Sequence, residues 1–125
     1  MPPPRPLRQR VGQAGEAAAL GHLRRHGYTI LATDWRCPLG QIDIVAETAG
    51  TLVVIEVKAR RSMAFGPPQE AVDRRKQRKL RLLLESYRSA TGRQHQPCRI
   101  DVIAVRLDAQ LAVRACDHIP NAVSG

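Results

Sequence analysis

Residues 40–60 read GQIDIVAETAGTLVVIEVKAR, and this stretch decides which fold the sequence predicts. Two runs rich in β-branched residues, 40–47 and 51–60, stand on either side of the dipeptide Ala49-Gly50. Strand-forming runs separated by so short a turn are typical of an antiparallel hairpin. The other elements can be placed outward from this hairpin.

The register of the hairpin is expected to bring two carboxylates together. A two-residue loop makes Thr48 face Thr51. Counting five positions back along each strand then places Asp43 opposite Glu56, with their Cβ atoms about 4.5–5.5 Å apart. A three-residue loop with a bulge would shift this register, and the sequence leaves that alternative open.

The facing pair of Asp43 and Glu56 needs a neutralising partner, because carboxylates so close repel each other. Mg²⁺ would serve, since it prefers one or two carboxylates, several waters and phosphate oxygens. Lys58, on the same strand face, would orient or deprotonate a water nucleophile, or neutralise charge on a transition state. Strand alternation sets these residues apart from Ile42 and Ile44 on the opposite face. The alternative is an ordinary salt bridge of Lys58 on a solvated sheet face, which stabilises little.

The remaining segments complete an α/β domain with a mixed sheet flanked by helices. Gly27 is expected to end the first helix, and Gly92 the second, which begins after two prolines. The second helix would cross over from the third strand to a fourth, with two-layer and three-layer packing both open. In chain order these segments are a helix over 12–26, a strand over 28–36, a helix over about 69–90, a strand over 98–107 and a short candidate strand over 111–119.

Composition and charge favour a polyanionic partner. The 125 residues suit one domain, and 20 Lys and Arg against 11 Asp and Glu give a net charge of +9. No apolar run approaches the roughly 20 residues of a membrane-spanning helix, and there is no secretory signal, which predicts a cytoplasmic protein without membrane contact. Residues 1–11 are expected to form a flexible basic N-terminal arm, and residues 12–125 the single domain.

A third carboxylate, Glu16, stands out in the first helix. It shares a helix face with Leu20 and Leu23, at the i, i+4 and i+7 spacing of a core-facing stripe. Two interpretations are open. Glu16 either belongs to the first turn, where the helix dipole favours an anion, or reaches over the sheet to join Asp43 and Glu56.

The second helix combines an apolar arc with many basic residues. Lys76 falls within the arc and Gln77 on its border, while the arc itself consists of Leu80, Leu83, Leu84 and Tyr87. The basic residues form either a solvated face or a track for a phosphate backbone. The residues expected to contact nucleic acid are Arg60, Arg61, Arg74, Arg75, Lys76, Arg78 and Lys79.

Together these residues resemble the YraN-like family of bacterial proteins, which belongs to the PD-(D/E)XK restriction-endonuclease-like superfamily and is similar to archaeal Holliday junction resolvases. The resemblance rests on Gly15-Glu16, DWRCPLGQIDIVA, VIEVKAR, KQRKL, RIDVIAV and the closing IPNAV. It implies an αβββαβ core with Mg²⁺ or Mn²⁺ as cofactor. The residues that it implicates in catalysis or metal binding are Glu16, Asp43, Glu56, the carbonyl of Val57, Lys58 and Gln77.

The resemblance implies a metal-dependent DNA endonuclease that hydrolyses phosphodiester bonds, with branched DNA such as Holliday junctions as candidate substrate and a homodimer as candidate assembly. One departure matters, because Gln41 stands where the family usually has Glu, which removes a formal charge beside Asp43. Two alternatives therefore stay open. The chain is either a non-catalytic DNA-binding module that retains the nuclease fold, or a scaffold for a protein partner.

Overall fold

The computed structural model describes residues 1–61 and 73–123, and within them the elements follow the predicted order. The chain forms helix α1 and then three strands, helix α2 and then two more strands. The elements are α1 (Leu7–Arg25), β1 (Thr29–Cys37), β2 (Gly40–Thr48), β3 (Thr51–Arg60), α2 (Arg74–Thr91), β4 (Cys98–Leu107) and β5 (Val113–Ile119). The short candidate strand near the C-terminus is thus confirmed as β5.

The sheet is mixed, and its strands lie in the order β1-β2-β3-β4-β5. Strands β3 and β4 are parallel, as the crossover through α2 requires, and the other neighbours are antiparallel. Thr48 pairs with Thr51, so the loop of the central hairpin has two residues, Ala49 and Gly50, as predicted. Both loop residues have positive φ, +48° and +78°, which matches the hairpin turn that suits the twist of the strands.

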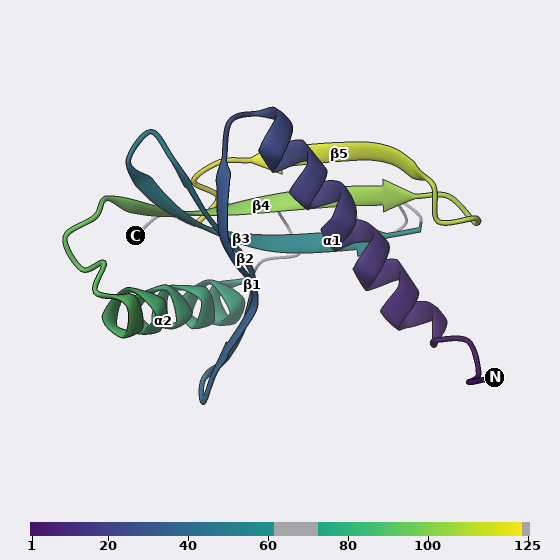
Figure 1. Cartoon of the computed structure of the whole chain (residues 1–125), viewed down its shortest axis with the longest axis horizontal. Coiled ribbons are helices and arrows are strands. Elements are labelled where there is room, and N and C mark those ends of the chain that lie inside the picture. The colour runs from purple at the N-terminus through teal and green to yellow at the C-terminus, as the bar shows by residue number, and fades with distance from the viewer. Residues whose placement is uncertain (62–72, 124–125) are drawn as a thin grey trace.

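The helices cover opposite faces of the sheet, which gives three layers (Figure 1). Alternate residues of β3 divide between two buried clusters: Val54 packs with Leu83 of α2, and Ile55 packs with Leu23 of α1. The predicted apolar arc of α2 is confirmed, since Leu80, Leu83, Leu84 and Tyr87 are all buried. Aliphatic side chains from both faces of the sheet therefore supply most of the core.

Helix α1 begins five residues earlier than the pattern predicts, at Leu7. Pro6 stands at its N-terminal boundary, and the N–H of Arg10 donates to the Pro6 carbonyl at 3.0 Å. A proline costs nothing there, because the first N–H groups of a helix have no intrahelical partner. Residues 7–11 are therefore helical and not irregular, and Figure 1 shows these turns projecting beyond the strands. The flexibility of the preceding residues stays a prediction.

Glycines end both helices as predicted. Gly27 has φ +81°, and the N–H of Tyr28 reaches back to the Leu23 carbonyl at 3.0 Å, which satisfies a carbonyl of the last turn. Gly92 ends α2 in the same left-handed conformation. The predicted start of α2 at about residue 69 is wrong, because Asp73 is extended and its side chain accepts the Lys76 N–H as an N-cap. Residues 69–72 lie outside the described chain.

The β1–β2 hairpin is irregular near Asp34, which has φ +49°. Ile42 packs with the cluster under α2, whereas Ile44 packs with the cluster under α1. The prediction that both isoleucines share one face is therefore wrong for Ile42. The pairing of β2 with β3 ends at Ile44 and Ile55. Before Ile44, β2 continues to pair with β1, and it twists so that Ile42 faces the other side of the sheet. This twist points the end of the hairpin toward α2 (Figure 1).

Candidate active site

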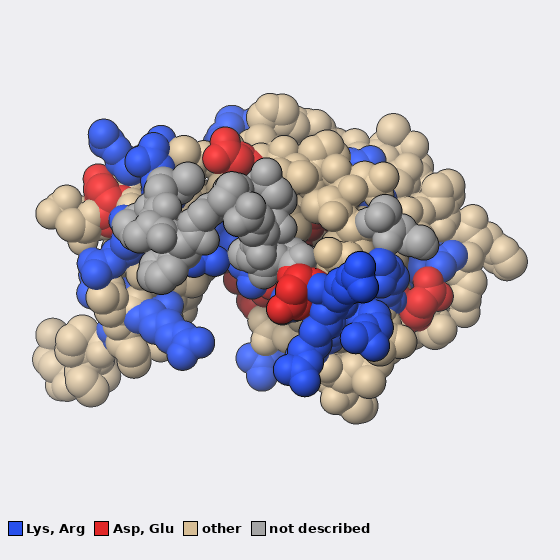
Figure 2. Space-filling model, turned by 180° about the vertical axis from the view of Figure 1, so that it is seen from behind, with Lys and Arg blue, Asp and Glu red and all other residues tan. Residues whose placement is uncertain are grey.

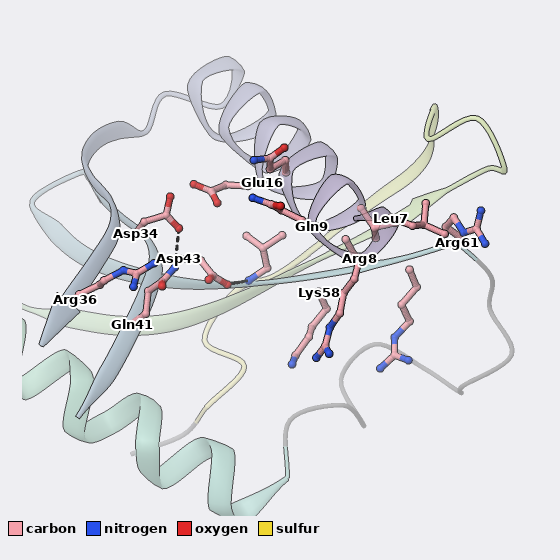
Figure 3. Close-up of a pocket in the computed structure, with 16 residues that line it drawn as sticks. Leu7, Arg8, Gln9, Glu16, Asp34, Arg36, Gln41, Asp43, Lys58 and Arg61 are labelled. Atoms are coloured by element: carbon pink, nitrogen blue, oxygen red, sulfur yellow. Dashed lines mark hydrogen bonds between the residues drawn. The ribbon is translucent and has the colours of Figure 1, made fainter. Parts of the chain in front are cut away.

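A cleft of about 970 Å³ lies between the N-terminal half of α1, the β1–β2 hairpin and the end of β3. Figure 3 shows its side chains, which come from elements far apart in the sequence. Carboxylates lie on the side of the β1–β2 hairpin and α1, and basic residues surround them. The charged residues of the lining are Arg8, Glu16, Asp34, Arg36, Asp43, Lys58, Arg60 and Arg61.

Asp43 lies where the hairpin register predicts. Continuing the Ile44–Ile55 pair by one residue places Asp43 opposite Glu56, although the strands no longer pair there. The N–H of Val57 donates to Asp43 Oδ2 at 2.9 Å instead. The pKa of Asp43 is raised to about 6, first by burial and then by the charge of Glu56, while the Val57 hydrogen bond and the charge of Lys76 oppose the rise.

Glu56 is only 6% exposed, and it lies beside the cleft, not on its lining. Two ammonium groups neutralise it. Lys58 Nζ lies 3.5 Å and Lys76 Nζ 3.1 Å from Glu56 Oε1. The salt bridge of Lys58 with Glu56 thus exists, but on a buried carboxylate and not on a solvated face. Lys76, predicted to contact nucleic acid, instead reaches inward from the first turn of α2.

Glu16 faces the cleft as the third carboxylate (Figure 3). Because α1 begins at Leu7, Glu16 lies more than two turns inside the helix, and the first-turn interpretation is wrong. Burial is the largest cause that raises the pKa of Glu16, to about 7, followed by the charge of Asp34, a hydrogen bond with Asp34, and the charge of Asp43. Glu16 thus belongs to the same electrostatic cluster as Asp43.

The donor chemistry of the cleft suits a hard divalent cation. Asp43 and Glu56 offer the carboxylate oxygens that Mg²⁺ and Mn²⁺ prefer, and both ions accept sites with few protein ligands and several waters. Within the described chain, no three His, Cys, Asp or Glu side chains converge closely enough to hold a metal ion in this arrangement. The donor groups of Asp43 and Glu56 therefore fit a site of two carboxylates with open positions, and Glu16 as a further ligand stays a prediction.

The predicted basic residues divide between two surfaces. Arg60 and Arg61 line the cleft beside Lys58. On α2 the exposed members are Arg74, Arg75, Arg78 and Lys79. Figure 2 shows Lys and Arg side chains on both sides of a hollow in the surface, with acidic side chains near its centre. Gln77 is not part of the cleft, since it lines a second cavity of about 470 Å³ with Arg74, Arg78 and Arg81.

Sequence reasoning missed three residues of the cleft: Asp34, Arg8 and Arg36. A signal for Asp34 existed, because residues 38–39 form a two-residue loop that pairs Cys37 with Gly40. Counting back from this pair places Asp34 opposite Asp43. Arg8 was missed because the first turns of α1 had no visible helical pattern.

A second buried carboxylate, Asp101, lies away from the cleft in β4. Arg99 Nε donates to Asp101 Oδ1 at 3.0 Å, so these two residues form an ion pair. His118 Nε2 lies 2.8 Å from Asp101 Oδ2, and the N–H of Asn121 donates to Asp101 Oδ1 at 2.8 Å. His118 also contacts His22 in the last turn of α1, with 3.1 Å between ring nitrogens. Asp101 thus ties β4, β5 and the end of α1 together.

The fold and the cleft define a class: a small three-layer α/β protein with a five-stranded mixed sheet, compatible with a restriction-endonuclease-like core, and a cleft beside its first helix that carboxylates and basic residues line together. Neither described helix is long and apolar enough to cross a membrane. Within this class the chain belongs to the uncharacterised protein family UPF0102, whose sequence profile matches residues 15–105. This is the YraN-like family that the motifs predict.

Relatives match along nearly their whole length. The chain is 49% identical to the UPF0102 protein of Moorella thermoacetica over 115 residues, which are 92% of this chain and 96% of the relative. It is 42% identical to a UPF0102 protein of Symbiobacterium thermophilum over 93% of this chain and 98% of the relative. For the UPF0102 protein of Desulforamulus reducens the identity is 37% over 93% and 97%.

Proposed function

We propose that this protein is a metal-dependent endonuclease that hydrolyses phosphodiester bonds in DNA. One observation supports this most directly: the half-buried carboxylate of Asp43 and the buried carboxylate of Glu56 interact electrostatically, and the ammonium of Lys58 lies 3.5 Å from Glu56 Oε1. Burial and then the charge of Glu56 raise the pKa of Asp43, and a bound cation would relieve the repulsion between the two carboxylates. Clustered carboxylates beside a lysine at the edge of an arginine-lined cleft suit phosphoryl chemistry better than a structural role.

Each residue of the site has a role in this proposal. Asp43 and Glu56 would hold Mg²⁺ or Mn²⁺, with the Val57 carbonyl as a further oxygen donor. A bound ion of this kind activates water and offsets the charge of a phosphate. The Val57 N–H fixes the orientation of Asp43. Lys58 places a positive charge beside the reacting phosphate and stabilises charge that develops in the transition state.

The basic residues of the cleft would hold the DNA backbone. Arg36 lies on the hairpin side of the carboxylates, whereas Arg8 and Arg61 lie on the opposite side with Lys58 (Figure 3). A DNA strand that passes over the carboxylates would therefore contact a basic side chain on each side of them. Guanidinium groups contact phosphate oxygens without reading bases, and the described lining has no aromatic ring for base stacking. Selection would then depend on DNA shape, which is consistent with a branched substrate.

A non-catalytic DNA-binding module remains the second candidate, and one observation favours it. Lys76 and Lys58 already neutralise Glu56, so the carboxylate has cationic partners without a metal. If these salt bridges persist in solution, Glu56 is a structural residue and only the basic surfaces function.

Cleavage of end-labelled DNA separates the two candidates. Four-way junctions, flaps, duplexes and single strands are incubated with Mn²⁺ or Mg²⁺ and wild-type protein, Glu56→Gln or Lys58→Ala. We expect metal-dependent cutting that falls at least about a hundredfold in both variants, the usual effect of removing a group that acts on the reacting atoms. Glu85→Gln is the matched control, because Glu85 is an exposed carboxylate of α2 paired with Arg88.

The opposite outcome is equally clear. Wild-type protein that binds these substrates in chelator with unchanged affinity, and cuts none of them with either metal, is a binding module. The proposal of a nuclease would then be wrong.

A further inference from the structure

Asp34 and Gln41 form a side-chain pair across the β1–β2 hairpin, beside the proposed metal ligands. Gln41 Nε2 donates to Asp34 Oδ1 at 2.7 Å, and Figure 3 shows this bond at the edge of the cleft. The neighbouring backbone pair of Arg36 with Gln41 sets the register, in which Asp34 faces Asp43. Two carboxylates and one amide thus meet at adjacent positions of two strands.

The backbone at Asp34 is held in an uncommon conformation. Its φ of +49° lies in the left-handed region, which residues with a side chain seldom adopt and which Asp and Asn tolerate best. The strand direction changes at this point, and the Asp34 side chain lies on the cleft side, toward Glu16 (Figure 3). Left-handed residues in a strand are characteristic of functional sites, where the surrounding structure maintains them.

The charges around Asp34 are unbalanced. Besides burial, the charge of Asp34 raises the pKa of Asp43 and that of Glu16, so the three carboxylates interact electrostatically. The ion pairs beside the cleft join Lys58 and Lys76 to Glu56, and the charge of Lys76 also acts on Asp43. A neutral amide at position 41 orients Asp34 without neutralising it.

We infer that Asp34 is a further acidic residue of the active site, held in place by Gln41, and that it adds its negative charge to the proposed metal site. This inference rests on the proposed function. Asp34 acts through the orientation of the other carboxylates and through its charge, so it is a positioning residue. Outer partners of metal ligands typically change metal affinity by about 10–100-fold when they are removed.

Substitutions that move the carboxylate from position 34 to position 41, at the other end of the same hydrogen bond, test this inference. Mn²⁺ binding to the full chain is measured by calorimetry without DNA for the wild type, Asp34→Asn, Gln41→Glu and the double variant Asp34→Asn/Gln41→Glu. Asn adopts the left-handed conformation as readily as Asp, so the single variant keeps the fold. Asp117→Asn, an exposed carboxylate of β5, is the control.

The inference requires a specific pattern. Asp34→Asn should weaken Mn²⁺ binding about 10–100-fold, and the double variant should recover most of that loss, because its carboxylate returns to the other end of the same hydrogen bond. Asp34→Asn with wild-type affinity would overturn the inference and leave the proposed function intact. Loss that the double variant does not recover would also overturn it, since the position and not the charge would then matter. A wild-type protein that does not bind Mn²⁺ would overturn both.

Discussion

Asp43 and Asp101 are both aspartates of the central strands, each near a different end of α1, but their surroundings are opposite. Asp101 is 0% exposed and accepts hydrogen bonds from Arg99 and the Asn121 N–H, with His118 at its second oxygen. Asp43 accepts one backbone N–H, and its other neighbours include Glu56 and Asp34, which repel it. One carboxylate is fully compensated and the other is not.

This difference separates a structural acid from a functional one. A buried carboxylate that serves the fold is surrounded by donors and cations, because an uncompensated charge would destabilise the folded state. A carboxylate that binds a ligand has fewer donors and cations from the protein around it, and the ligand supplies the missing interactions. The electrostatic cost of Asp43 and Glu16 therefore supports the proposed site.

The largest effect is expected at Asp101. Asp101→Ala leaves Arg99, His118 and the Asn121 N–H without their acceptor, and removal of one partner from a buried ion pair costs about 3–5 kcal/mol. The free energy of unfolding from urea titration at pH 7.5 measures this. Asp117→Ala, on the exposed side of β5, should stay within about 0.5 kcal/mol of the wild type. A loss below about 1 kcal/mol for Asp101→Ala would show that the network is not structural.

Substitution of Asp43 is expected to change the free energy of unfolding by less, and to increase it. The folded-state pKa of about 6 exceeds the unfolded value of 3.8, so the folded protein binds more protons between these values and loses stability as pH rises. Asp43→Asn keeps an acceptor for the Val57 N–H and removes the charge. At pH 8 without metal it should stabilise the fold by roughly 1–2 kcal/mol, after allowance for partial exposure.

The same comparison can be made across pH. The advantage of Asp43→Asn over the wild type should be present at pH 8 and disappear as pH falls from about 7 to about 4. His22 has a lowered pKa and changes stability in the opposite sense in part of this range, so the difference between the two proteins is the informative quantity. An advantage that does not change with pH would contradict the electrostatic origin.

The smallest effect is expected at the arginines around the cleft. Arg36→Ala should weaken DNA binding for all sequences alike and reduce the slope of log affinity against log salt by about 1, the effect of one lost phosphate contact. Fluorescence anisotropy in chelator at several salt concentrations measures the slope. Arg106→Ala, on exposed β4 surface outside the cleft, should leave it unchanged. An unchanged slope for Arg36→Ala would show that Arg36 of the β1–β2 hairpin does not contact a DNA phosphate.

Much of the architecture followed from local chemistry. Ala49-Gly50 specified a two-residue loop, so the register from the pair of Thr48 with Thr51 to the pair of Ile44 with Ile55 could be counted from the sequence. Gly27 and Gly92 marked the helix ends, because a left-handed residue there has no steric cost for glycine. The family was also predictable, since its motifs lie in these same segments.

The sequence by itself therefore determined the elements, the central register and the principal carboxylates, because each depends on residues within one hairpin or one helix. Only the tertiary structure decided that Lys76 reaches Glu56, that Gln77 lines a different cavity, and that Asp34 joins Glu16. These outcomes depend on how α1 and α2 pack on opposite faces of the sheet and where the β1–β2 hairpin turns over. Contacts between distant segments are set by packing of the whole core, which no local pattern encodes.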